Sequence, residues 1–213
     1  MNFKKLILGG GAGIMKPVVF CILPLACALC FSASAQSGGN RKSTSDDPRD
    51  GQKYHTVEIG KKTWLSENLN YAAGGSVCYG NSASNCAKYG RLYTWYDAMK
   101  ACPAGWRLPD NDDWQNLVQI AGGEAVAGGK LKSKTGWHEN GNGTDDVGFS
   151  ALPGGYRGPD SSFYSVGHYG TWWSATEYNA NVAYSRYTLY YGESVVWLDT
   201  YKSYLFSVRC VRD

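Results

Sequence analysis

The sequence contains few of the groups that usually carry catalysis or bind metals. Histidine occurs only three times, as His55, His138 and His168, and no two histidines have a metal-type spacing such as His-x-x-x-His. A Gly-x-Ser-x-Gly nucleophile motif is also absent. We therefore expect no catalytic residues and no cofactor, and we interpret the protein as a non-enzyme.

Long apolar runs are missing too. The longest one, residues 18–31, falls short of the roughly 20 residues that cross a bilayer, but it has the length of a signal-peptide core. Basic residues precede it, and Ala33-Ser34-Ala35, a small-x-small signal peptidase site, follows it. The sequence predicts a cleaved signal peptide over residues 1–35, with translation from Met1 or, as the alternative, from Met15.

Cleavage after Ala35 predicts an exported protein without a transmembrane segment. We expect it outside the cell or on the outer cell surface, with the periplasm as the alternative. Acylation of Cys27 or Cys30 is a competing interpretation, but neither cysteine has the full set of neighbours that a lipobox requires. Residues 36–50 carry no apolar side chain except proline, which predicts a flexible polar spacer before a domain over residues 51–213.

The expected mature chain has no excess of either charge. All 18 acidic residues follow Ala35, whereas three of the 21 basic residues precede it, which leaves 18 basic against 18 acidic residues. The overall charge of +3 therefore belongs to the leader. Because nucleic-acid binding depends on a basic surface, we expect no nucleic-acid partner.

Four cysteines remain after the leader: Cys78, Cys86, Cys102 and Cys210. An even number in an exported protein is typical of disulfides, and four cysteines allow three pairings. We predict Cys78–Cys86, which closes a short loop rich in Gly, Asn and Ser, and Cys102–Cys210, which ties a helix end to the last strand. A metal site is the alternative, but residues 36–213 have no Cys-x-x-Cys.

The first half of the expected domain combines a hairpin with two helices. Two short β-type runs meet at a turn near Gly60, and residues 72–90 have the composition of a loop. A first helix is predicted over residues 92–101, and a second begins after Pro109 with Asp110 as its N-cap. The predicted core-facing stripes are Leu92, Trp95, Tyr96 and Met99 on the first helix, and Trp114, Leu117, Val118 and Ala121 on the second.

The second half reads as a series of short strands separated by turn residues. These runs cover residues 148–152, 171–176, 182–191, 194–198 and 204–212. We expect Trp172, Trp173 and Trp197 in the core. Helices followed by many short strands favour an α+β fold.

The order of motifs is specific enough to indicate a family. The mature chain resembles the Fibrobacter succinogenes major paralogous domain over nearly all of residues 52–213. The matching pieces are VEIGKKTWLSENLNYA (57–72), CYGNSASNCAKYGRLYTW (78–95), CPAGWRLPDNDDW (102–114), GFSALPGGYR (148–157), TWWSATE (171–177) and FSVRCVRD (206–213).

That family in turn is similar to the formylglycine-generating-enzyme type of C-type-lectin-like fold. The shared pattern is a helix with Trp95-Tyr96-Asp97-Ala98, then Arg107-Leu108-Pro109, acidic residues and Trp114. The resemblance implies a loop-rich domain whose N- and C-terminal strands lie together. It does not imply the oxidase activity, which uses two neighbouring cysteines near the C-terminus, because only Cys210 lies there. A shared fold does not carry a shared activity.

An oxygen-rich loop is a weak calcium candidate. Asn142, Asp145 and Asp146 lie in a run that alternates oxygen side chains with glycine, as calcium loops can. The run lacks a downstream bidentate glutamate, and Asn and Gly alternate in ordinary turns as well. The Glu-Pro-Asn and Gln-Pro-Asp motifs of calcium-dependent lectins are absent.

The aromatic C-terminal third is the best candidate for a binding surface. Thirteen Tyr, Trp or Phe residues occur among the 44 residues 161–204. On a strand over 183–191, Ala183, Ser185, Tyr187, Leu189 and Tyr191 would share one face, and Tyr184, Arg186, Thr188 and Tyr190 the other. Both faces carry tyrosines, so some should reach solvent, although strands also favour Tyr and Trp for packing alone.

Binding loops favour Tyr, Ser, Gly and Asn, because a ring gives contact area at low entropic cost and small polar residues adapt their hydrogen bonds. We therefore expect a non-catalytic binding module, with a polysaccharide or another envelope protein as its partner. A structural envelope protein without a discrete ligand is the alternative. The candidate ligand-binding residues are Tyr156, Arg157, Tyr164, His168, Tyr169, Tyr178, Asn179 and Asn181.

Overall fold

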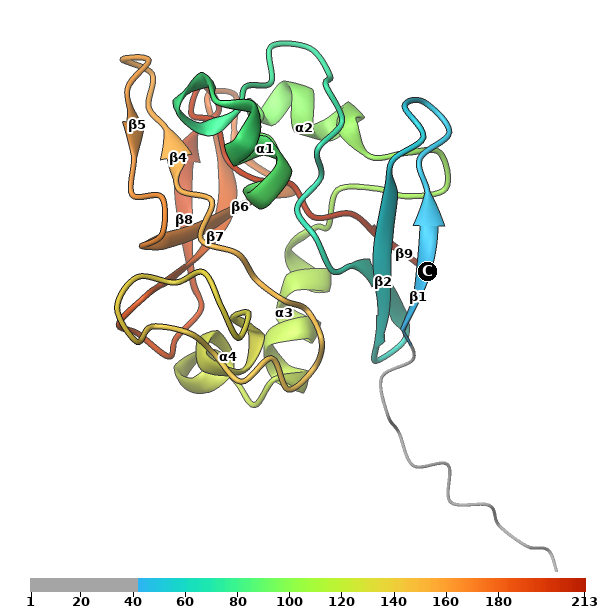
Figure 1. Cartoon of the computed structure of the whole chain (residues 1–213), viewed down its shortest axis with the longest axis vertical. Coiled ribbons are helices and arrows are strands. Elements are labelled where there is room, and N and C mark those ends of the chain that lie inside the picture. Colours follow the sequence, from blue (N-terminus) through green and yellow to red (C-terminus); the bar gives the residue numbers. More distant parts are fainter. Residues whose placement is uncertain (1–41) are drawn as a thin grey trace, which may run out of the picture. The chain divides into compact units, whose positions relative to one another are not determined.

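The structure is a computed structural model that describes residues 42–213 (Figure 1). The predicted signal peptide, its cleavage site, the alternative start at Met15 and the acylation of Cys27 or Cys30 lie outside the described residues. Within them, four α-helices and one short 3-10 helix accompany three sheets whose strands all pair antiparallel. The predicted α+β class is confirmed. None of the helices in this part of the chain has the length and apolarity to span a membrane.

The N-terminal sheet has the strand order β1-β2-β3-β9. Its strands are β1 (Lys42–Asp46), β2 (Lys53–Ile59), β3 (Lys62–Leu65) and β9 (Val211–Arg212). The predicted hairpin is confirmed as β2 and β3, with a turn at Gly60, whose φ of 64° suits glycine. Because β9 pairs with β3, the expected meeting of N- and C-terminal strands is also confirmed.

The prediction of a flexible spacer up to residue 50 is wrong where the structure describes it. β1 pairs with β2 from Lys42 opposite Val57 to Asp46 opposite Lys53. An edge strand is held by backbone hydrogen bonds, so it needs no apolar side chains of its own. The ordered domain therefore includes residues from Lys42 onward rather than beginning at residue 51.

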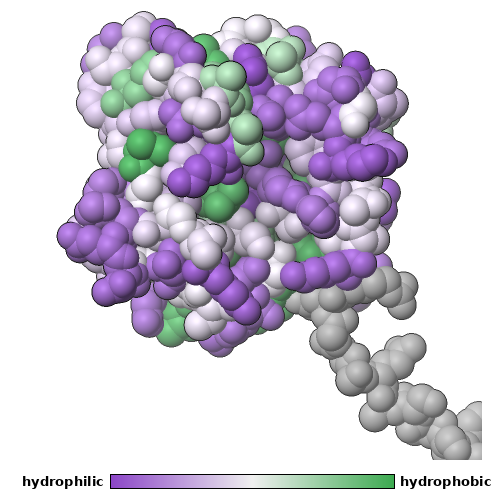
Figure 2. Space-filling view, in the orientation of Figure 1, coloured by the Kyte–Doolittle hydropathy of each residue, from purple (hydrophilic) through white to green (hydrophobic). Residues whose placement is uncertain are grey.

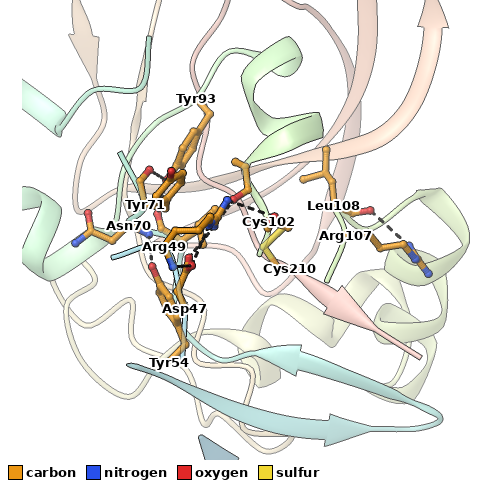
Figure 3. The surroundings of a disulfide bond; sticks show 12 residues. Asp47, Arg49, Tyr54, Asn70, Tyr71, Tyr93, Cys102, Arg107, Leu108 and Cys210 are labelled. Carbon is orange, nitrogen blue, oxygen red and sulfur yellow. Dashed lines mark hydrogen bonds and ion pairs between the residues drawn. A yellow bond between two sulfur atoms is a disulfide. The ribbon is translucent and has the colours of Figure 1, made fainter. Parts of the chain in front are cut away.

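The turn after β1 is fixed by a buried ion pair. Asp47 is almost fully buried and accepts hydrogen bonds from the Arg49 guanidinium at 2.9 and 2.7 Å. Arg49 also donates to the carbonyl of Ala101 at 2.7 Å and lies 3.6 Å from the centre of the Tyr71 ring. Figure 3 shows this arginine reaching from the N-terminal segment to the backbone beside the Cys102–Cys210 disulfide. The segment is thus tied to the body of the domain.

Both predicted disulfides are present. Cys78–Cys86 links the residue before the 3-10 helix (Tyr79–Asn81) to helix α1 (Ala83–Tyr89). Cys102–Cys210 links the end of helix α2 (Trp95–Ala101) to the residue before β9, across 108 positions of sequence. Helix α1 corrects the prediction that residues 72–90 form only a loop, and the disulfide that it carries compensates for its short length.

The second predicted helix is confirmed as α3 (Asn111–Ile120). Asp110 caps it in a capping box with Asp113, and the predicted stripe of Trp114, Leu117, Val118 and Ala121 is buried. A further helix, α4 (Glu124–Leu131), follows directly and was not predicted, because its two internal glycines resemble a loop.

The predicted stripe of the first helix is correct in half of its members. Leu92 and Trp95 are buried as predicted, but α2 begins only at Trp95, and Tyr96 and Met99 are 57% and 44% exposed. The helix buries Ala98 and Ala101 in their place, since alanine lets the helix lie close to its neighbours.

The C-terminal sheet has the order β6-β7-β8. Its strands are β6 (Tyr169–Asn179), β7 (Val182–Leu189) and β8 (Val196–Tyr201), and a small ribbon of β4 (Tyr156–Arg157) and β5 (Phe163–Tyr164) lies beside it (Figure 1). The strands predicted at 171–176, 182–191 and 194–198 are confirmed with shifted ends. Residues 148–152 make only a single bridge, Ala151 with Lys132, and residues 204–212 make bridges that end in β9.

Two aromatic cores hold these layers together. One contains Trp64, Trp114, Phe149 and Trp172, and the other contains Tyr93, Trp173 and Phe206. The core placement of Trp172 and Trp173 is therefore confirmed. Trp197 was predicted in the core but is 51% exposed, because it lies on the edge strand β8.

Asp113 allows a prediction about acid stability. Burial raises the pKa of this carboxyl, but hydrogen bonds from Arg107 and the Asp110 amide outweigh burial and lower its pKa below 3.8. The resulting stabilisation is fully present above pH 3.8 and is lost as the pH falls through the lower folded-state pKa. At neutral pH, Asp113→Asn should lower the free energy of unfolding by about 1–3 kcal/mol.

Urea denaturation of both proteins between pH 2 and pH 7 measures this difference. The gap between wild type and Asp113→Asn should shrink below about pH 4. Asp112→Asn is the matched control, since Asp112 lies exposed in the same first turn. A gap that stays constant with pH would contradict the assignment.

Candidate functional site

A groove lined by tyrosines opens on one face of the C-terminal sheet. We call it the tyrosine groove. It has a volume of about 530 Å³ and is formed by β6, β7, β8 and the segment before β9. Six tyrosines line it together with Thr171, Ser185, Leu189, Leu198, Asp199, Thr200 and Phe206; the tyrosines are Tyr156, Tyr169, Tyr187, Tyr191, Tyr201 and Tyr204.

The alternation of side chains explains the part of this lining that β6 and β7 supply. Ser185, Tyr187 and Leu189 occupy one face of β7, and Tyr191 follows in the same direction. Thr171 lies opposite Tyr187 on β6, and Leu198 lies opposite Ser185 on β8. The predicted sharing of a face by the odd-numbered residues of 183–191 therefore matches four of its five members. Ser185 is small and buried, so the groove is deeper at this position than at the larger side chains beside it.

The aromatic rings of the groove pack against one another and against neighbouring rings. Tyr169 and Tyr187 lie nearly parallel, with centroids 6.5 Å apart and planes at 19°. Tyr156 stacks on Tyr164 at 5.3 Å and meets Phe206 edge-on at 6.0 Å. Such contacts restrict ring rotation, so a ligand would meet aromatic faces that are already in place.

The groove is polar but carries little charge. Asp199 is the only Asp, Glu, Lys, Arg or His residue among those that line it. Burial raises the pKa of Tyr156, and the neighbouring phenol of Tyr204 raises it further. This phenol is therefore neutral near pH 7 and can both donate and accept a hydrogen bond. The arrangement suits a neutral ligand with apolar faces and hydroxyl groups.

The structure brings together two of the eight predicted ligand-binding residues, Tyr156 and Tyr169. Tyr164 stacks behind Tyr156 and donates to Asp160 at 2.6 Å; this hydrogen bond raises the pKa of Tyr164. His168 lines an adjoining cavity with Tyr169 and Tyr191.

The other four predicted residues lie elsewhere. Arg157 turns away, donating to the Ser161 carbonyl at 3.3 Å. Asn179 closes the β6–β7 turn by accepting hydrogen bonds from the amides of Asn181 and Val182. Tyr178 is 56% exposed and meets Tyr184 edge-on, outside the tyrosine groove. Asn181 lines a cavity beside Tyr96 that shares Tyr201 with the groove.

Four groove tyrosines were not among the predicted ligand-binding residues: Tyr187, Tyr191, Tyr201 and Tyr204. The alternation along residues 183–191 was a usable signal for Tyr187 and Tyr191. Tyr201 and Tyr204 had no such signal, because their placement depends on how the chain returns past β6 after β8.

The oxygen-rich loop is explained by turns and close packing. Asn142 accepts from the Trp137 amide at 3.0 Å, and both carboxylate oxygens of Asp145 accept from Ser150 at 2.7 Å. At Gly141 and Gly143 a Cβ atom would lie 2.4 Å from a backbone oxygen, so only glycine fits. Within residues 42–213, no three His, Cys, Asp or Glu side chains gather as a metal site would require, and Asp146 joins no such group.

Comparisons with known proteins are limited to the family level. No curated protein and no solved structure matches the chain. The model of one family, the Fibrobacter succinogenes major domain, matches residues 57–212, which include both disulfides and all of the tyrosine groove. The chain belongs to the Fibrobacter succinogenes major domain family.

Proposed function

We propose that the chain is an exported, non-catalytic module that binds a neutral polysaccharide in the tyrosine groove. The observation that carries the proposal is the lining itself: six tyrosines, two threonines and a serine around a groove with a single carboxylate. Planar rings pack against the apolar C–H faces of a sugar, and phenol and hydroxyl groups exchange hydrogen bonds with sugar hydroxyls. A groove of about 530 Å³ falls within the size range of small-molecule sites.

Two further features support a binding role over thiol-based oxidation. All four cysteines of the described residues are paired in disulfides, and Cys210 is joined to Cys102 rather than to a neighbouring cysteine. The disulfides also support export, because they persist in oxidising compartments outside the cytosol.

We further propose the C-type-lectin-like fold of formylglycine-generating-enzyme type, supported by the β3–β9 pairing and by the Arg107–Asp113 motif that opens α3.

Substitution of one ring in the groove tests the proposal. Tyr187→Ala should weaken binding to soluble β-glucan by about fivefold or more, the equivalent of roughly 1 kcal/mol of ring contact. Tyr187→Phe keeps the ring and should retain most of the affinity. Isothermal titration on proteins whose fold has been checked by circular dichroism provides the measurement.

Tyr178→Ala is the matched control, because Tyr178 is an exposed tyrosine of the same sheet outside the groove. Its affinity should equal that of the wild type. Equal affinities for Tyr187→Ala and Tyr178→Ala in folded proteins would show that the groove does not bind the polysaccharide.

A further inference from the structure

We infer that the ligand is an extended chain that crosses four adjoining cavities rather than a short sugar held in one of them. This inference rests on the proposed function and narrows its ligand class. The tyrosine groove adjoins an end cavity of about 400 Å³, which Tyr96 and Asn181 line. It also adjoins a histidine cavity of about 540 Å³ at His168, and a loop cavity of about 590 Å³ at Asn142 adjoins that one.

Consecutive cavities share tyrosines. Tyr201 lines both the end cavity and the tyrosine groove. Tyr169 and Tyr191 line both the groove and the histidine cavity. Tyr190 and Tyr191 line both the histidine cavity and the loop cavity. The four spaces therefore adjoin one another, and Tyr191 borders three of them.

The rings at two of these junctions are unusually open to solvent. Tyr191 is 71% exposed and Tyr201 is 63% exposed, the two largest values among the exposed large hydrophobic side chains of the described residues. A ring on the border between two cavities makes its full contact only with a ligand that continues from one into the other. A short ligand inside one cavity would leave most of the ring surface in water.

The turn that presents Tyr191 is held in place by Lys132. The buried ammonium of Lys132 donates to the carbonyls of Leu189, Tyr190 and Gly192 at 3.0–3.3 Å. Tyr190 meets Tyr191 edge-on at 5.0 Å. Because both neighbours of Tyr191 are bound through their backbone, the exposed ring stands on a fixed support.

Charge along the path favours a neutral ligand. The loop cavity holds two basic and two acidic residues, namely Lys130, Lys132, Glu139 and Glu193. In the end cavity, Lys202 pairs with Glu177, and the groove contributes only Asp199. Because these charges leave an excess of only one negative charge, the path suits an uncharged polysaccharide better than an anionic one. On the face shown in Figure 2, hydrophobic residues form only small separate patches.

A length series separates an extended site from a single one. Cello-, xylo- and manno-oligosaccharides from disaccharide to hexasaccharide are titrated into the full-length chain expressed for secretion. For the sugar that binds, affinity should rise by about tenfold or more from the disaccharide to the hexasaccharide, because further units reach further rings. Tyr191→Ala and Tyr201→Ala should each reduce this rise with length, because each removes a ring on the border between two cavities. Tyr178→Ala should leave the rise unchanged.

The other possible outcomes overturn either the extended site alone or the proposed function together with it. Equal affinity for short and long oligosaccharides, lost in Tyr187→Ala, would overturn the extended site and leave the proposed function intact. A rise with length that persists in both Tyr191→Ala and Tyr201→Ala would also overturn it. Binding to none of the neutral oligosaccharides, or only to peptides or anionic chains, would contradict the proposed function and this inference together.

Discussion

Replacing Cys102 and Cys210 together with alanine is expected to lower the free energy of unfolding by about 4–5 kcal/mol. The disulfide closes a loop of 108 positions, and on the chain-entropy model a long loop restricts the unfolded chain more than a short one. The same double substitution at Cys78 and Cys86, which are eight positions apart, should cost about 2–3 kcal/mol.

The position of the long-range disulfide adds to this difference. Cys210 is fully buried and immediately precedes β9, the strand that joins the C-terminus to β3. Arg49 binds the carbonyls of Ala101 and Cys102 at the other end of the bond (Figure 3). Urea denaturation of the two double variants, compared under identical conditions, provides the measurement. An equal loss in both, or a larger loss without Cys78–Cys86, would contradict the expectation.

Arg209→Ala is expected to lower the free energy of unfolding by about 3–5 kcal/mol. The Arg209 side chain is fully buried, and its guanidinium donates to the carbonyls of Leu65, Phe149 and Ser150 at 2.6–3.0 Å. It also donates to Asn68 at 2.8 Å. Burial lowers the pKa of Arg209 to about 9, so the group is still charged at neutral pH. Its removal would take this donor from all four acceptors, of which Asn68 keeps a hydrogen bond from the Trp172 indole.

Arg212→Ala is the matched control, because Arg212 is only three positions from Arg209 but is exposed and lies over the ring of Trp106. That substitution should cost no more than about 1 kcal/mol. Both variants are compared by chemical denaturation. A loss below about 1 kcal/mol for Arg209→Ala would show that the buried guanidinium does not hold β3 and the loop before β4 together.

Apart from the long-range disulfide and the pairing of β3 with β9, the features predicted correctly from the sequence are those with a local cause. The hairpin at Gly60 follows from a turn residue between β-type runs, and α3 follows from its cap at Asp110 and its apolar period. The elements missed carry no apolar pattern of their own. β1 is a polar strand that exists because β2 offers it a backbone ladder, and α1 is a short helix held by its disulfide to Cys78. The apolar period along these segments therefore did not reveal them.

The binding surface was predicted by composition but not by position. Tyrosine enrichment pointed to the correct third of the chain, and Tyr156 and Tyr169 lie in the groove. Tyr178 has the same chemistry but lies outside it, because side chains alternate along β6 and Tyr178 is on the face opposite to Tyr169 and Thr171, where it contacts Tyr184. Composition carries no information about which face of a strand a tyrosine occupies.

The most direct test of polysaccharide binding is to observe which amides respond to a sugar. An isotope-labelled sample of the chain is titrated with the neutral hexasaccharide that binds best, and backbone amide shifts are followed by nuclear magnetic resonance. We predict saturable shifts that centre on Tyr169, Tyr187 and Thr200 and extend to Tyr191 and Tyr201. Saturable shifts that centre on Tyr178 and Tyr184, or no shifts with any neutral hexasaccharide, would contradict binding in the tyrosine groove.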